Sequence, residues 1–270
     1  MKRVVFTDLD GTLLDRFTYS YEKSLDAIEL LKAKEVPIVF CSAKTAAEQK
    51  EYVKELGIVD PFIVENGGAV YIPEGYFDFA ITDARTNSGY LVIQLGTPYK
   101  AVRKVLKNIE VELSIQIKGF ADMTAAEVSQ RTRLSPKFAA LSKIREYDEP
   151  FYLDCGPEEV KQVLNKIEQA GLRWTIAGTH YSAIGNADKG KAVKILLDLL
   201  RRTFGEIYTI GLGDTRNDSS MLSCMDVPVL VQQAPDKWAD IDLPGLRKVD
   251  CIGPEGWSKV IFELFGDGVT

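Results

Sequence analysis

The first third of the chain alternates short apolar runs with longer segments of helical periodicity. The runs at residues 4–8 and 36–42 are rich in valine, isoleucine and phenylalanine, as buried strands are. Between them, apolar residues recur at helical spacing over residues 21–34, and Thr45 and Glu48 form a capping box that starts a second helix. Strands that alternate with helices favour a parallel sheet covered by helices on both faces. The sequence therefore predicts an α/β fold with a Rossmann-like core.

The middle of the chain follows a different pattern. It carries helices and strands in similar proportion, including a helix expected over residues 99–109 and a strand expected over residues 114–120. The alternation of strand and helix resumes after this segment. We therefore expect an α+β cap domain, residues 83–185, inserted into a core domain made of residues 1–82 and 186–270.

The composition is that of a globular protein, with 46% hydrophobic and 27% charged residues. A formal net charge of −6 disfavours binding to nucleic acids or anionic membranes, and no segment resembles a signal sequence or a membrane span. The four cysteines are far apart and the chain has one histidine, so a zinc site is not expected. We expect a cytoplasmic protein with reduced cysteines, either a monomer or a homodimer.

Two aspartates, Asp8 and Asp10, follow the first predicted strand directly. Ligands of open α/β sheets bind at the carboxyl ends of the strands, where these side chains would lie. One carboxylate can attack phosphorus to form an aspartyl phosphate, while the other protonates the leaving oxygen and then activates water. Two carboxylates this close need a hard cation with oxygen ligands, and Mg²⁺ is expected, with Mn²⁺ and Co²⁺ left open. A plain strand-to-turn junction is the alternative interpretation.

Two residues with phosphate-binding chemistry lie at the ends of other predicted elements. Ser42 ends the second predicted strand, where its hydroxyl and the neighbouring amides can hold a phosphoryl oxygen. A serine at such a junction is more often a local cap. Lys189 begins a predicted helix, where an ammonium group and the helix dipole can both neutralise phosphate charge. Lys191 competes for this role, and either lysine could be a solvated surface charge.

An acidic loop follows the strand predicted over residues 207–214. Asp214, at the strand end, is placed to bind a metal ion. Asn217 and Asp218 can hold metal-bound water or orient Lys189 from behind. A calcium-binding loop or a solvated acidic loop is the alternative.

Together these segments resemble the four motifs of the haloacid dehalogenase superfamily, in the order in which that superfamily carries them. The matching residues are Asp8-x-Asp10-Gly11-Thr12, Ser42, Lys189 and Gly213-Asp214-x-x-Asn217-Asp218. The resemblance implies a phosphatase with Asp8 as the nucleophile and Asp10 as the acid/base. It also implies that Ser42 and Lys189 hold the phosphoryl group, and that Mg²⁺ is bound by Asp8, Asp214 and the backbone carbonyl of Asp10.

The segment at residues 65–68 and the position of the insert resemble the branch of this superfamily that includes sugar-phosphate phosphatases. Within that branch, residues 145–151, 178–181 and 186–191 resemble the mannosyl-3-phosphoglycerate phosphatase family, which implies a mannose–glycerate phosphate as the substrate. The residues expected to contact this substrate are Asn66, Gly67, Arg145, Glu149 and His180. An exposed ion pair between Arg145 and Glu149 is the alternative for those two residues.

Other functions fit the same motifs. The chain could be another sugar-phosphate phosphatase, either of the sucrose-phosphate type or of broad specificity, or a phosphosugar mutase. A non-enzymatic sensor of sugar phosphates is the alternative outside enzymes. The pair of Asp8 and Asp10 argues against a sensor, because a protein that only binds has no use for an acid/base beside a nucleophile.

Overall fold

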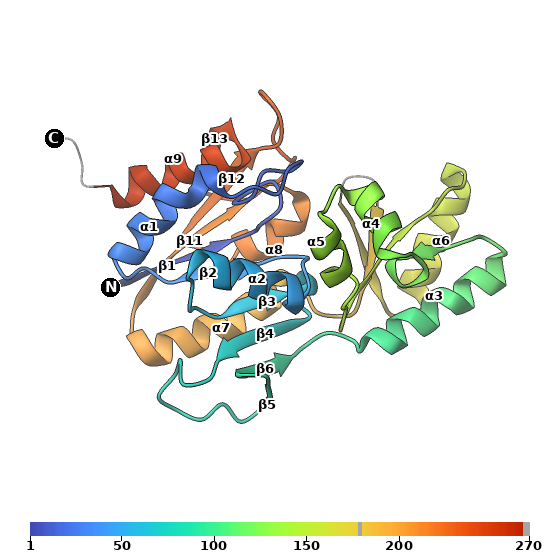
Figure 1. The fold of residues 1–270 in the computed structure, drawn as a ribbon, viewed down its shortest axis with the longest axis horizontal. Helices are drawn as coiled ribbons and strands as arrows, with labels where there is room; N and C mark the ends of the chain where they lie inside the picture. Colours follow the sequence, from blue (N-terminus) through green and yellow to red (C-terminus); the bar gives the residue numbers. More distant parts are fainter. Residues whose placement is uncertain (178–179, 267–270) are drawn as a thin grey trace.

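The computed structural model describes residues 1–177 and 180–266, which form two sheets flanked by helices (Figure 1). The strands of the larger sheet are β1 Lys2–Thr7, β2 Ile38–Cys41, β3 Phe62–Val64, β4 Ala69–Pro73, β5 Ala84–Asn87, β6 Tyr90–Gln94, β11 Ile207–Gly213, β12 Val227–Gln232 and β13 Arg247–Ile252. Over the described residues their order is β13-β12-β11-β1-β2-β3-β4-β6-β5. Strand β1 thus lies near the middle of the sheet.

The strands from β13 to β3 are parallel, as the sequence predicts, and β4, β6 and β5 extend the sheet in antiparallel fashion. Val4 and Phe6 of β1 pack into the core on one face of the sheet, while Val5 packs into the core on the other face. Because both faces are buried, β1 is apolar at successive positions. The parallel arrangement brings the carboxyl ends of β1, β2 and β11 to one edge.

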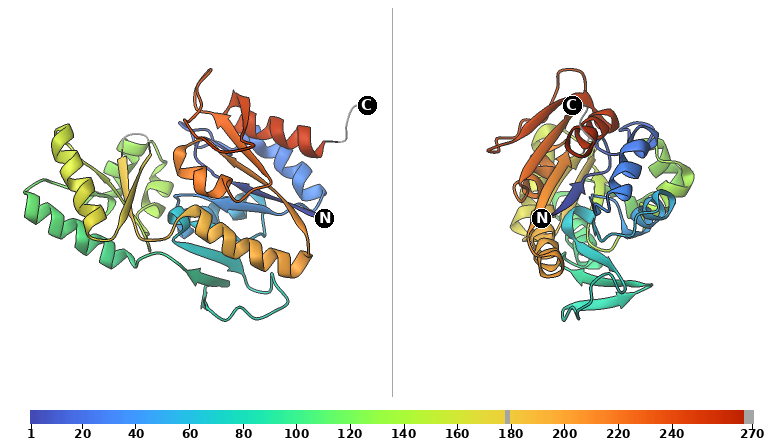
Figure 2. Two further views of the ribbon diagram at one scale, coloured as in Figure 1. Left: turned by 180° about the vertical axis from the view of Figure 1, so that it is seen from behind. Right: turned by 90° about the vertical axis from the view of Figure 1, so that its left-hand side faces the viewer.

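Helices cover both faces of this sheet, which confirms the predicted α/β fold (Figure 2). They are α1 Leu25–Ala33, α2 Ala46–Leu56 and α9 Gly253–Phe265 on one face, and α7 Lys189–Phe204 and α8 Ser219–Leu222 on the other. Helix α2 begins with the predicted capping box, in which Thr45 Oγ1 accepts from the N–H of Glu48 at 3.1 Å. In the described part of the chain, no helix has the length and apolar character of a membrane span.

The second sheet belongs to the insert. Its strands are β7 Lys118–Gly119, β8 Glu149–Tyr152, β9 Arg173–Ala177 and β10 His180–Ile184, in the order β7-β8-β10-β9 over the described residues. Helices α3 Tyr99–Leu113 and α6 Pro157–Gln169 share an apolar core with this sheet. Helices α4 Ala125–Thr132 and α5 Pro136–Leu141 form a smaller core beside it. We call this unit the cap; it lies at one end of the larger sheet (Figure 1).

Two expectations for the insert differ from the structure. The strand expected over residues 114–120 is reduced to β7, because the chain turns into a 3₁₀ helix at Phe120. Residues 84–94, expected in the insert, form β5 and β6, which are paired with the larger sheet through β4. Stacking of Phe62 on Tyr71, with Tyr90 edge-on to both rings, fixes this hairpin to the core. We therefore propose that the cap starts after Gln94.

Candidate active site

Asp8 lies directly after β1, and its N–H donates to the carbonyl of Leu212 in β11 at 2.9 Å. Its buried carboxylate accepts a hydrogen bond from Lys189 Nζ at 2.7 Å, and the same ammonium donates to Asp218 Oδ1 at 2.7 Å. Burial raises the pKa of Asp8 to about 8 against the effect of Lys189, and the charges of Asp218 and Asp214 act in the same direction as burial. One buried lysine thus bridges two buried carboxylates.

The structure brings Lys189, and not Lys191, to this cluster. Lys189 is the first residue of α7 and its side chain points into the site. Lys191 is exposed, and its ammonium contacts the carbonyl of Asn186. The turn before α7 is capped by Asp188, whose carboxylate accepts from the N–H of Lys191 at 2.8 Å. This cap fixes the first turn of the helix, from which Lys189 reaches Asp8.

Asp214 follows β11 and is fully buried. Its Oδ1 accepts from Thr12 Oγ1 at 3.2 Å, and its Oδ2 accepts from the guanidinium of Arg16. The carboxylate of Asp218 closes the same turn, because its Oδ2 accepts from the N–H groups of Asp214 at 3.1 Å and Thr215 at 3.0 Å. Burial raises the pKa of Asp214 to about 7, and the charge of Asp218 adds to that effect. Asp218 therefore both shapes the loop and holds Lys189.

Carboxylate oxygens of Asp8, Asp214 and Asp218 lie within 4.8 Å of one another. Three buried carboxylates this close repel each other, which is the situation that a hard divalent cation relieves. Gly11 makes room here: its φ is +83°, and a methyl group at this position would lie 2.7 Å from Asp214 Oδ2. The donor set therefore fits Mg²⁺ or a similar cation.

The side chain of Asp10 lies outside this cluster. Its Oδ1 lies 3.0 Å from Lys44 Nζ, and that ammonium also lies 3.5 Å from Glu48 Oε1 and 4.8 Å from the ring centre of Tyr19. Burial opposes a charge on Lys44, but Asp10 and Glu48 raise the pKa of the ammonium above its ordinary value. Sequence reasoning missed Lys44. Its one signal was its place two residues after Ser42, at the start of the turn into α2.

Ser42 is buried at the end of β2, next to the turn that follows β3. Its N–H donates to the carbonyl of Ile63 at 3.1 Å, and its Oγ accepts from the N–H of Lys44 at 3.3 Å. The carbonyl of Ser42 accepts from the N–H of Asn66 at 3.1 Å. Ser42 therefore holds its own turn together and connects it to Asn66, which lies in the 3₁₀ helix η2 Glu65–Gly67.

Asn66 and Gly67 have protein partners in this structure. Asn66 donates through Nδ2 to Asp148 at 2.8 Å and accepts from Asn217 Nδ2 at 2.7 Å. Asn217 in turn accepts from the hydroxyl of Thr175 in the cap at 3.4 Å. Gly67 packs on the backbone at the start of α7, where any side chain would collide with the preceding carbonyl. These two residues thus join the acidic loop, the cap and the first turn of α7.

Arg145 and Glu149 do not pair with each other, and neither is exposed. The alternative of an exposed ion pair is therefore wrong. Arg145 donates to the carbonyl of Ala43 at 2.7 Å and lies 2.5 Å from Asp148 Oδ1. Glu149 lies inside the cap, where it accepts from the hydroxyl of Tyr99 at 2.6 Å. Their contact with substrate stays a prediction. The partners of these two side chains favour a role in positioning the cap and the turn after β2.

Glu65 of the core domain binds the backbone of the segment that follows Arg145. Its carboxylate accepts from the N–H groups of Glu146 at 3.0 Å, Tyr147 at 2.8 Å and Asp148 at 3.0 Å. Burial raises the pKa of Glu65 to about 8, opposed by the charge of Arg145. We call Glu65, Arg145 and Asp148 the docking triad. It ties the segment between α5 and β8 to the turn after β2, which carries Ser42.

His180 begins β10, with its ring 6.0 Å from Phe120 and 5.8 Å from Tyr152. Burial lowers the pKa of His180 to about 4, helped by the charge of Arg145 and opposed by that of Asp10. The imidazole is therefore neutral near pH 7 and lies close enough to Asp10 to sense its charge. The hydroxyl of Tyr152 is buried without a hydrogen-bond partner among the described residues. Residues 178 and 179, part of the segment used to identify the substrate, lie outside the described residues.

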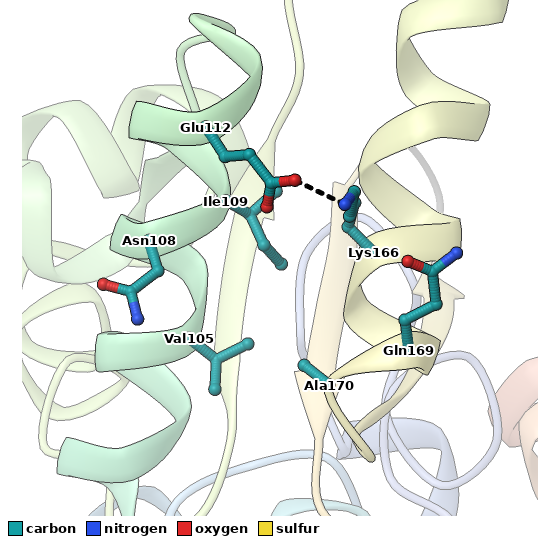
Figure 3. Close-up of a pocket in the computed structure, with 7 residues that line it drawn as sticks. All are labelled: Val105, Asn108, Ile109, Glu112, Lys166, Gln169 and Ala170. Carbon is teal, nitrogen blue, oxygen red and sulfur yellow. Dashed lines mark hydrogen bonds and ion pairs between the residues drawn. The ribbon is translucent and has the colours of Figure 1, made fainter.

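A concave surface lies on the cap between α3 and α6, with a volume of about 240 Å³ (Figure 3). Its lining residues are Val105, Asn108, Ile109, Glu112, Lys166, Gln169 and Ala170. An ion pair between Glu112 and Lys166 crosses it. Its lining contains none of the predicted site residues.

Substitution of Arg145 by methionine should destabilise the fold by about 3–5 kcal/mol, because Glu65 and Asp148 would be left buried without their cation. We expect activity to fall by a similar factor on every phosphate ester tested. Urea unfolding and kcat/KM on two substrates would measure this. Arg247→Met, which removes an exposed arginine paired with Glu263, is the matched control and should change stability by less than about 1 kcal/mol. A selective loss on one substrate at unchanged stability would support direct contact instead.

Comparison with known proteins agrees with this geometry. The family model of haloacid dehalogenase-like hydrolases matches residues 5–241. A glucosyl-3-phosphoglycerate/mannosyl-3-phosphoglycerate phosphatase of Methanococcoides burtonii is 43% identical over 98% of both chains. A protein of the same name from Persephonella marina is 38% identical over 98% of this chain and 97% of its own.

Other relatives differ in name or in distance. A mannosyl-3-phosphoglycerate phosphatase of Pyrococcus furiosus is 38% identical over 86% of this chain and 91% of its own. Among solved structures, a haloacid dehalogenase-like hydrolase from B. subtilis has a TM-score of 0.70 at 18% identity, covering 98% of this chain and all of that one. At this identity the structural likeness concerns the fold alone.

Proposed function

Since this chain belongs to the haloacid dehalogenase-like hydrolases and is a phosphatase, we propose that it hydrolyses mannosyl-3-phosphoglycerate, or the glucosyl compound, with Mg²⁺. The observation that carries the chemistry is the buried pair of Asp8 and Lys189 at 2.7 Å, beside Asp214 and two residues from Asp10. The names of relatives up to 43% identical over 98% of the chain support the substrate.

In the proposed mechanism Asp8 attacks phosphorus while the bond from phosphorus to the leaving oxygen breaks. Asp10 gives a proton to that oxygen, which leaves as an alcohol. A water molecule then attacks the aspartyl phosphate, with Asp10 taking its proton. The bond between Asp8 and phosphorus breaks, which restores the carboxylate and releases inorganic phosphate.

Asp8, Asp214 and the backbone carbonyl of Asp10 would hold the Mg²⁺ ion. When bound, the ion neutralises negative charge on the phosphoryl oxygens and the carboxylates. Lys189 would hold the phosphoryl group and keeps the charge of Asp8 balanced, while Asp218 fixes the position of the ammonium. Ser42 is proposed to hold a phosphoryl oxygen at the end of β2.

The cap is proposed to cover the substrate and keep bulk water out during attack on phosphorus. His180 is a cap residue that feels the charge of Asp10, and its neutral imidazole can exchange hydrogen bonds with sugar hydroxyls. Asn66, Gly67, Arg145 and Glu149 are proposed to act on the substrate by positioning the turns and the cap around it. Their protein partners support this role.

Release of inorganic phosphate tests the proposal. We expect the highest kcat/KM on the mannosyl and glucosyl 3-phosphoglycerates, compared with sucrose 6-phosphate, mannose 6-phosphate and p-nitrophenyl phosphate. EDTA should abolish the activity and Mg²⁺ should restore it. A preference for a sugar phosphate without the glycerate would refute the proposed substrate. Conversion to an isomeric phosphosugar without phosphate release would indicate a mutase.

A further inference from the structure

A second buried lysine lies next to the acid/base. Lys189 is 2% exposed and bridges Asp8 and Asp218, with both distances 2.7 Å. Lys44 is 4% exposed and bridges Asp10 and Glu48 at the longer distances of 3.0 and 3.5 Å. The side chain of Asp10 is 39% exposed, although Oδ1, the oxygen that faces Lys44, is itself buried. Each of the two catalytic aspartates therefore has its own buried ammonium.

The four motifs of the haloacid dehalogenase superfamily include one of these lysines, Lys189. Lys189 is proposed to neutralise the nucleophile and the phosphoryl group, whereas the resemblance to the four motifs assigns no role to Lys44. A buried ammonium is costly unless it meets anions, and the rings of Tyr19 and Tyr52, 4.8 and 5.7 Å from Nζ, cover it further. Asp10 and Glu48 supply two anions to Lys44, and an ammonium has a third N–H that an anionic group of the ligand can meet.

Other cations near the site contact residues other than Asp10. Arg145 donates to two backbone carbonyls and lies 2.5 Å from Asp148, and Arg16 donates to Asp214. Arg131 lies 4.5 Å over the ring of Tyr152 and 3.6 Å from the exposed Asp154. Lys44 is thus the buried cation in direct contact with the residue that must approach the leaving oxygen.

The reach of Lys44 matches the chemistry of a 3-phosphoglycerate ester. A general acid lies about 2.6–3.2 Å from the oxygen that it protonates. In such an ester the carboxylate carbon is three bonds from that oxygen. When Asp10 contacts the oxygen, the carboxylate can therefore contact Lys44, which lies beside Asp10. A carboxylate that enters a site lined by Asp8, Asp10 and Glu48 needs a cation to offset its desolvation and its repulsion.

We propose that Lys44 binds the carboxylate of the leaving group and so makes the enzyme selective for phosphate esters that carry one. This inference rests on the proposed function and names the residue that distinguishes a glycerate ester from an uncharged sugar phosphate. The carboxylate takes up one of the three N–H bonds of the ammonium. Glu48, held in its capping box with Thr45, keeps the lysine in place.

A pair of substrates that differ in this one charge tests the proposal. Mannosyl-3-phosphoglycerate and its carboxamide have nearly the same shape, and wild type should prefer the carboxylate. Lys44→Met should lower that preference, measured as the ratio of the two kcat/KM values, by on the order of 10- to 100-fold. Lys44→Arg should keep a preference. Lys161→Met, which removes an exposed lysine from α6, is the charge-matched control and should keep the wild-type ratio.

A double variant separates loss of carboxylate binding from loss of the fold. Lys44→Met leaves Glu48 buried and unpaired, so Lys44→Met/Glu48→Gln, which removes that charge, is measured beside it with unfolding temperatures. Loss of the preference in a folded variant supports the proposal. An unchanged ratio, or an equal loss on both substrates, overturns it. Wild type that hydrolyses both compounds equally also overturns it while the phosphatase proposal stands, and wild type that hydrolyses neither refutes the proposed function itself.

Discussion

Replacement of Asp8 by asparagine should lower the rate of phosphate release by at least about 10⁴-fold. An amide oxygen is a poor nucleophile, so the aspartyl phosphate would not form. The fold should persist, because asparagine has the same shape and its Oδ1 can still accept from Lys189. Phosphate release under saturating substrate and Mg²⁺ measures the loss. Beryllium fluoride, which mimics a phosphoryl group on a carboxylate, should bind to wild type and not to the variant.

Asp78→Asn is the matched control for this experiment. Asp78 is exposed before the β5–β6 hairpin, so the same chemical change there should leave both rate and stability at wild-type values. Unfolding temperatures of both variants separate a catalytic loss from an unfolding loss. If Asp8→Asn kept even a tenth of the wild-type rate, the covalent role of Asp8 would have to be abandoned.

Replacement of Asp10 by asparagine should cost about 10²–10⁴ in rate on a sugar phosphate, the usual contribution of a general acid/base. The loss should be smaller for formation of the aspartyl phosphate from p-nitrophenyl phosphate, because that phenolate leaves without a proton. Single-turnover release of the alcohol or phenol isolates this first step from the later attack of water. Lys44 keeps an oxygen acceptor in the variant, so its burial should not unfold the protein.

The comparison between the two leaving groups decides the role of Asp10. Equal losses on the sugar phosphate and on p-nitrophenyl phosphate in the first step would mean that Asp10 does not protonate the leaving oxygen. A loss confined to the second step would restrict it to activation of water. The same Asp78→Asn protein serves as the control for substitution of an aspartate.

The residues around Asp8 could be predicted because their chemistry depends on strand ends. In a parallel sheet the side chains that follow each strand gather at one edge, whatever the order of the strands. Asp8, Ser42 and Asp214 could therefore be assigned to a common site before the order β11-β1-β2 was known. The capping boxes of α2 and α4 were equally local, since each depends on two residues three positions apart.

Lys44 could not be found in this way. A single lysine after a strand reads as surface charge, and only the adjacency of β1 and β2 brings it to Asp10. The alternative of an exposed ion pair between Arg145 and Glu149 is wrong for a related reason. They are close in sequence, but β8 begins at Glu149, which faces the interior of the cap, while Arg145 lies in the segment before the strand and turns toward the core. Proximity in sequence does not imply a shared partner.

The sequence alone places the β5–β6 hairpin in the insert because β5 gives a weak strand signal. Residues 84–87 are partly or fully exposed, so no apolar alternation marks them as a strand of the larger sheet. What attaches the hairpin is the antiparallel pairing of β6 with β4 and the contact of Tyr90 with the rings of Phe62 and Tyr71. Such a contact depends on the register between strands, which the sequence alone does not specify.

The two segments that join the cap to the core run side by side. The chain leaves the larger sheet after Gln94 and returns at Gly185, where an added methyl group would collide with the side chain of Thr97. Entry and exit points this close mean that the whole cap could be excised and its ends rejoined by a short turn, or exchanged for another insert, without rethreading the sheet. The docking triad limits such an exchange, because a transplanted cap would need its own backbone N–H groups to meet Glu65. The path of the chain thus makes the cap a separable unit, and an exchanged cap would have to match the buried carboxylate of Glu65.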